Sequence, residues 1–112
     1  MGTPQHAEEN QRRFKGITAA EFIESKDMTQ GITYYQDLLK NPGDNILVIH
    51  QNTRFAYLNA IKIHKYQEEW ELALTAAQDL LAYHIKEGAN GLYLEAANKK
   101  VARLTRKVAA LK

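Results

Sequence analysis

The segment from Tyr57 to Tyr83 reads YLNAIKIHKYQEEWELALTAAQDLLAY. Apolar residues recur at intervals of three and four on both sides of a short polar link at 67–69. This interval is typical of one buried face of a helix. Two such faces joined by so short a link predict an antiparallel helical hairpin.

The order of residues in this hairpin resembles the tetratricopeptide repeat. Trp70 stands just before the small residue Ala73, and Ala77 and Leu80 follow at core spacing. A fainter upstream copy carries Ala19, Phe22, Gly31, Tyr35, Leu38 and Pro42. The resemblance covers roughly residues 17–85. The two small positions lie 42 residues apart, which is longer than the standard period of this repeat and implies an elongated helix at 45–66.

The resemblance implies a concave surface lined by the first helix of each hairpin. It assigns partner binding to Phe55, Leu58, Lys62, Lys65 and Tyr66. Simple core packing is an equal alternative for Phe55 and Leu58. The family's clamp for acidic chaperone tails is not expected, because its first Lys and Asn fall on Gly16 and Ala20 here, and only Asn59 remains in the second repeat.

The remaining segments extend this all-α prediction to a single domain over residues 17–112, preceded by a flexible arm over residues 1–16. Thr18 and Glu21 form a capping-box pattern for a helix over 18–26. Asp27 is expected to cap the next helix, which ends before Pro42. Trp70 is expected to pack at the turn, and the following helices are expected over 69–86, ending at Gly88, and from 91 to the terminus.

Residues 45–66 allow two interpretations. The apolar run at 46–49 and the segment at 55–57 could pair as a β-hairpin. However, Gln51-Asn52-Thr53-Arg54 lacks the glycine that tight hairpins favour. Apolar spacing of three and four across the segment, with Asn45 or Asp44 as the cap, predicts a helix instead.

The C-terminal helix combines an apolar stripe with a strong positive charge. Residues 91–112 carry six Lys/Arg and one Glu, whereas residues 1–90 carry nine Lys/Arg and twelve Asp/Glu. The stripe consists of Leu94, Ala97, Val101, Leu104, Val108 and Leu111. It predicts an amphipathic capping helix, with a self-pairing coiled coil, and so a homo-oligomer, as the alternative. The flanking cations are Lys99, Lys100, Arg103, Arg106 and Lys107, a solvated face or a surface for phosphates.

Catalytic and metal-binding patterns are not recognisable. The chain has no cysteine, no glycine-rich phosphate loop and no His-Glu-x-x-His element. His64 and His84 could meet across the hairpin, but no third ligand stands at a fixed spacing. We therefore expect no enzyme activity, no cofactor and no metal. The longest uninterrupted apolar run, 46–49, is too short to span a bilayer.

These patterns predict a cytoplasmic, non-catalytic protein–protein interaction module. Its partner, another protein, would bind in the helical groove or on the C-terminal helix. The alternative is a nucleic-acid-binding helical protein that uses the basic face of the C-terminal helix.

Overall fold

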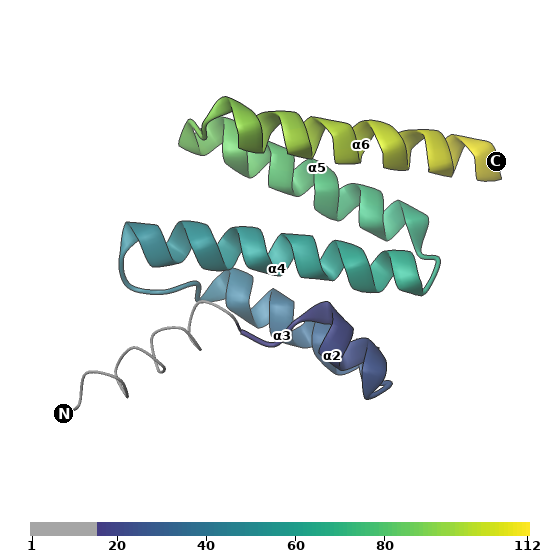
Figure 1. Cartoon of the computed structure of the whole chain (residues 1–112), viewed down its shortest axis with the longest axis horizontal. Coiled ribbons are helices and arrows are strands. Elements are labelled where there is room, and N and C mark those ends of the chain that lie inside the picture. The colour runs from purple at the N-terminus through teal and green to yellow at the C-terminus, as the bar shows by residue number, and fades with distance from the viewer. Residues whose placement is uncertain (1–15) are drawn as a thin grey trace.

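A computed structural model describes residues 16–112, and these residues form helices without any β-strand. The helices are α2 (Ala19–Glu24), α3 (Met28–Lys40), α4 (Ile46–Tyr66), α5 (Trp70–Glu87) and α6 (Gly91–Leu111) (Figure 1). The all-α prediction is confirmed. Because α4 is continuous, the β-hairpin interpretation of 46–57 is wrong, while the expected long helix at 45–66 is present. The arm predicted at 1–16 lies outside the described residues except for Gly16.

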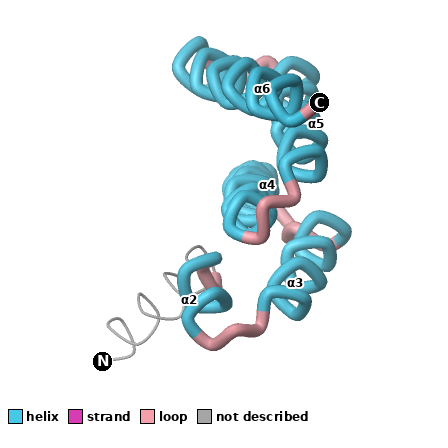
Figure 2. The backbone as a smooth tube through the Cα atoms, turned by 90° about the vertical axis from the view of Figure 1, so that its right-hand side faces the viewer, coloured by secondary structure: helices cyan, strands magenta, loops and turns pink. Residues whose placement is uncertain are grey.

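Consecutive helices run antiparallel and pack in two layers. Figure 2 shows α2, α4 and α6 on one side and α3 and α5 on the other. Along the chain each helix contacts the next, and α2 also contacts α4. Helix α4 therefore has neighbours on two sides, α2 and α3 on one and α5 on the other. None of the helices in residues 16–112 is long and apolar enough to cross a membrane.

Side-chain caps fix where three of these helices begin. Thr18 and Glu21 form the predicted reciprocal capping box at α2. Asn45 accepts a hydrogen bond from Val48 N at α4, and Asn90 accepts from Leu92 N and Tyr93 N at α6. Asp27 stands at the N-cap of α3 as predicted, but its carboxylate makes no capping hydrogen bond. Its backbone instead belongs to the turn that closes α2.

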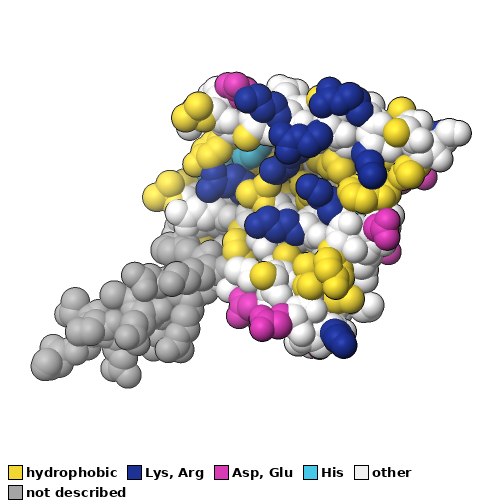
Figure 3. All heavy atoms as spheres, turned by 45° about the vertical axis from the view of Figure 1, so that its right-hand side comes forward, with side chains coloured by type: hydrophobic (Ala, Val, Ile, Leu, Met, Phe, Trp, Pro, Cys, Tyr) yellow, Lys and Arg dark blue, Asp and Glu magenta, His cyan; other side chains and the backbone are white. Residues whose placement is uncertain are grey.

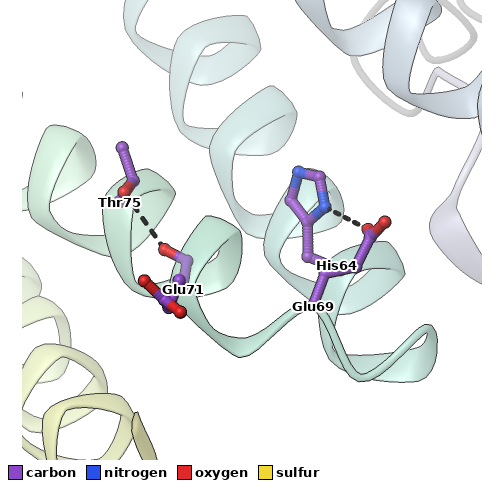
Figure 4. Close-up of polar contacts among 4 residues, drawn as sticks. All are labelled: His64, Glu69, Glu71 and Thr75. Atoms are coloured by element: carbon purple, nitrogen blue, oxygen red, sulfur yellow. Dashed lines mark hydrogen bonds and ion pairs between the residues drawn. The ribbon is translucent and has the colours of Figure 1, made fainter.

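Three of the four interhelical turns close with the same backbone hydrogen bonds. Lys26, Glu68 and Gly88 adopt positive φ angles of 59°, 59° and 66°. At each turn this residue and the next donate to carbonyls of the preceding helix, a Schellman arrangement. In the α4–α5 turn the arrangement also brings Glu69 Oε1 to 2.8 Å from His64 Nδ1, while Thr75 Oγ1 donates to the Glu71 carbonyl (Figure 4).

The core consists of two clusters, and α4 contributes to both. The first joins α2, α3 and α4 around Ala19, Phe22, Tyr35, Ala56 and Ile63. The second joins α4, α5 and α6 around Ile61, Ala73, Ala77, Leu80 and Leu104. The 42-residue offset seen in the sequence recurs here. Gly31 and Ala73 are both buried, each five residues after a turn residue with positive φ.

The apolar stripe of α6 packs on the second core cluster rather than standing free. Ala97 and Leu104 are buried, and Val101 packs against the cluster. The capping-helix interpretation of this stripe therefore describes the fold. Trp70 packs against the same cluster as expected, but it is only half-buried, and Lys107 Nζ lies 4.8 Å from the centre of its ring.

Gly31 allows the close approach of α2, α3 and α4. A Cβ atom placed there would lie 2.7 Å from Ile63 Cδ1 and 2.8 Å from Phe22 Cγ. Overpacking of this kind costs about 1–3 kcal/mol. In an open helix, by contrast, replacing Gly by Ala gains up to about 1 kcal/mol.

We predict that Gly31→Ala lowers the free energy of unfolding by about 1 kcal/mol despite its better helix propensity. Urea unfolding followed by circular dichroism measures this change. The control is Gly91→Ala in the first turn of α6, where a Cβ meets nothing within 4 Å; it should leave stability unchanged or raised. A stabilised Gly31→Ala protein would contradict the close packing.

Candidate interaction groove

Helix α4 carries a ridge of residues that are exposed or only partly buried. The ridge consists of Leu47, Gln51, Arg54, Leu58, Lys62 and Lys65, at spacings of four, three, four, four and three. Such spacing places all six on one side of a helix. Because α2 and α3 cover one flank of α4 and α5 covers another, this ridge faces the space between α2 and α6. We call this surface the groove.

The first part of the groove is a cationic hollow between α4 and α6. It has a volume of about 250 Å³. Leu58, Ile61, Lys62, Lys65, Lys100, Arg103 and Leu104 line it. Ile61 and Leu104 are buried at its base, and the four basic side chains surround them. Figure 3 shows Lys and Arg side chains gathered on this face with hydrophobic side chains between them.

A second hollow of about 580 Å³ lies on the α2 side of the ridge, lined partly by Phe55, Leu58 and Lys62. Asn59 also lines it, but its amide is already engaged. Its Oδ1 accepts from Ala19 N at 2.8 Å, and its Nδ2 donates to the Phe55 carbonyl at 2.8 Å. Asn59 therefore holds α2 on α4, a structural role that the resemblance did not indicate.

The third part, the aromatic hollow, lies where α4 and α6 begin and α5 ends. It has a volume of about 390 Å³. Tyr93 stacks on His84 with ring centres 5.5 Å apart, and the Arg54 guanidinium carbon lies 4.2 Å from the centre of the Tyr93 ring. His50 contacts the Tyr83 hydroxyl through Nδ1. No sequence pattern predicts this cluster, because its residues come from three separate helices.

The three hollows form one continuous surface. The aromatic hollow and the α2-side hollow share Gln51 and Arg54, and the α2-side and cationic hollows share Leu58 and Lys62. The structure therefore joins residues that the sequence assigned to two separate sites. Leu58, Lys62 and Lys65, from the groove prediction, face the same hollow as part of the basic face of α6.

The predicted site residues divide unequally between this groove and other surfaces. Phe55 lines the groove and also packs against the first core cluster, so the expected core packing is present, while its role in partner binding stays a prediction. Tyr66 is 59% exposed at the end of α4 and lies outside the three hollows described above.

The basic face of α6 also divides. Lys100 and Arg103 line the cationic hollow, and Lys107 lies over Trp70. Lys99 pairs with Glu95 at 3.4 Å on the exposed side of the helix. Arg106 is exposed and lies two residues from both Leu104 and Val108, which points it away from the core.

The cationic hollow concentrates like charge. Burial lowers the pKa of Lys100, and the positive charges of Lys65, Arg103 and Lys62 lower it further. Within residues 16–112, the ion pairs are His64–Glu69 and Lys99–Glu95, so none of the four basic residues of the hollow pairs with a carboxylate there. An anionic group entering the hollow would relieve this mutual repulsion.

The histidines do not form a metal site in the part of the chain that the structure describes, where no group of three or more potential ligands comes together. The expectation that His64 and His84 could meet is wrong. Both lie near the C-terminal ends of antiparallel neighbours, so they stand at opposite ends of the hairpin. His64 faces Glu69, and His84 faces Tyr93.

Comparison of the chain with family models, with curated proteins and with solved structures finds no match. The interpretation of the groove therefore depends on its own geometry and chemistry.

His84 makes the stability of the domain sensitive to pH. Burial lowers its pKa below the usual 6.5, and the nearby positive charge of Arg54 and the imidazole of His50 lower it further. The unfolded chain thus binds a proton at His84 more readily than the folded chain does. The contribution of neutral His84 to stability is fully present above about pH 6.5, the usual pKa in the unfolded chain. It is lost as the pH falls from there through the lowered pKa of the folded chain.

We predict that His84→Gln reduces the loss of stability on going from about pH 7.5 to about pH 5.5. Thermal unfolding at both pH values measures the difference between variant and wild type. His64→Gln is the control, because it removes a histidine at the other end of the α4–α5 hairpin, where the side chain contacts Glu69. A His84→Gln protein with an unchanged or larger loss would contradict the assignment.

Proposed function

We propose that this protein is a protein–protein interaction module whose groove binds an acidic segment of a partner protein. The observation that carries the proposal is the cationic hollow. Lys62, Lys65, Lys100 and Arg103 converge there from two helices, without a carboxylate partner among residues 16–112. A partner's carboxylates would supply the missing counter-charge.

The base of the hollow favours a polypeptide over a simple anion. Leu58 is only partly buried and packs against the second core cluster, so its remaining apolar surface faces the groove. Apolar atoms beside cations suit a segment that alternates acidic and apolar side chains, because its apolar side chains are then removed from water while its carboxylates pair with the cations.

The architecture gives a second reason for the proposal. Helical hairpins with equivalent turns and equivalent small buried residues recur at an offset of 42 residues. Stacked hairpins of this kind create extended concave surfaces suited to partner segments. The resemblance to the tetratricopeptide repeat points to the same use of the first helices, here α2 and α4.

Nucleic acid is the rival ligand, because the same cations could contact phosphates. Tyr93, an aromatic residue near the start of α6 that lines the groove, already contacts His84 and Arg54. Because these contacts occupy its ring, Tyr93 is not free to stack on an unpaired base. This occupation favours the acidic segment over a single strand.

We predict that a fluorescein-labelled peptide of about fourteen residues, rich in Glu and Leu, binds the wild-type protein and that the double variant Lys62→Glu/Arg103→Glu binds it about tenfold more weakly. The physical reason is that two favourable contacts in the groove become repulsive. Fluorescence anisotropy at physiological salt measures both dissociation constants.

The matched control is Lys99→Glu/Arg106→Glu, which changes the net charge equally but on the outer side of α6. It should weaken binding by less than about threefold, since exposed charges are screened at this salt concentration. Equal weakening by both double variants would indicate only general attraction between opposite charges. Tighter binding of a twelve-nucleotide strand or duplex than of the peptide would support the rival function.

A further inference from the structure

The aromatic hollow differs chemically from the rest of the groove and calls for a different ligand group. Its walls include the stacked rings of His84 and Tyr93. Leu47 lines the hollow and is 70% exposed, and Leu92, which precedes the lining residue Tyr93 in the sequence, is 77% exposed. Exposed apolar side chains around a concave site are typical of a binding surface.

Arg54 marks the border between this hollow and the α2-side hollow, since it lines both. Its guanidinium lies against the Tyr93 ring, which fixes its orientation. No hydrogen bond or ion pair within residues 16–112 uses its N–H groups. A carboxylate at this border could therefore accept two hydrogen bonds from a preoriented donor.

The negative charge of Glu87 disfavours an acidic group inside the aromatic hollow. Glu87 lines the same hollow as His84, so a carboxylate placed inside would face repulsion. An apolar or aromatic group there avoids this cost and covers the exposed Leu47. The favourable arrangement has an apolar group inside the hollow and a carboxylate beside Arg54.

We propose that the aromatic hollow binds an apolar or aromatic anchor side chain of the same acidic segment whose carboxylates occupy the cationic hollow. This inference rests on the proposed function and makes it more specific. The groove then recognises two features together, an anchor at the end formed by the start of α4 and of α6, and acidic residues towards Lys65 and Arg103.

A comparison with the hollow at the opposite end of the molecule shows why the aromatic hollow suits the anchor of an acidic segment better. Exposed leucines also occur there, Leu72 at 52% and Leu111 at 62%. They line a hollow together with Glu68, Glu69 and Glu71. These three carboxylates repel an acidic segment, whereas Arg54 and the cationic hollow attract one.

The test uses two labelled peptides with the same acidic body, one with a terminal Trp and one with Ser in its place. Burial of a large apolar side chain contributes about 1.5–3 kcal/mol, so the Trp peptide should bind the wild-type protein at least about tenfold more tightly. In the double variant Leu47→Ser/Leu92→Ser this advantage should fall to less than about threefold.

The matched control is Leu72→Ser/Leu111→Ser, which removes two exposed leucines at the other end and should keep the full advantage of Trp. All four leucines are more than half exposed, so each variant should fold, and circular dichroism verifies this. A Trp peptide labelled with a photoactivatable group should crosslink to residues of the aromatic hollow.

The outcomes separate this inference from the proposed function. If neither peptide binds, the proposed function is wrong. If both bind equally well, the acidic-segment function stands and the anchor inference is wrong. The anchor inference is also overturned if the advantage of Trp survives in Leu47→Ser/Leu92→Ser or disappears in the control.

Discussion

The fold depends on the close approach of α4 to a helix on each of two sides. Gly31 makes this possible on the side of α2 and α3, because it leaves room for Phe22 and Ile63. Ala73 and Ala77, both fully buried, make it possible on the side of α5. Small residues at a helix crossing let backbones approach and larger neighbours interdigitate. The two core clusters that result are connected through α4 alone.

This constraint also determines where a ligand can bind. A helix packed from two sides can offer only its remaining side to solvent, and on α4 that side is the ridge from Leu47 to Lys65. Helix α6 packs on α5 rather than directly on α4, which leaves the space between α4 and α6 open. The groove is thus a consequence of how the layers stack. Its chemistry is set by side chains that the core does not need.

The sequence predicts this arrangement well where local rules operate. The capping box at Thr18, a cap at Asn45 or Asp44, and the end of α5 at Gly88 all follow from neighbouring residues, and the structure selects Asn45. Asp27 lacks the expected capping hydrogen bond for an instructive reason. The Schellman turn at Lys26 uses the backbone N–H of Asp27, which donates to the Phe22 carbonyl. Lys is not a residue that indicates a left-handed turn, so the sequence does not predict this turn.

The candidate site was harder to predict because it depends on contacts between distant segments. Periodicity placed Lys100, Arg103 and Arg106 on one basic face, yet only the packing angle of α6 decides which of them turn towards α4. The aromatic hollow is harder still to predict from the sequence, since nothing in the spacing of His50, Tyr83 and Tyr93 indicates that they lie close together.

The clustered cations reveal something that stability alone does not explain. Bringing Lys62, Lys65, Lys100 and Arg103 together opposes folding through repulsion, and burial of Lys100 adds a desolvation cost. Neutral residues at these positions would fill the same space without that cost. On the outer side of α6, by contrast, Lys99 does have a carboxylate partner, Glu95. An arrangement that leaves four cations around an apolar base without carboxylate partners among residues 16–112 is understandable when the counter-charge comes from another molecule, which is the physical basis for the proposed partner.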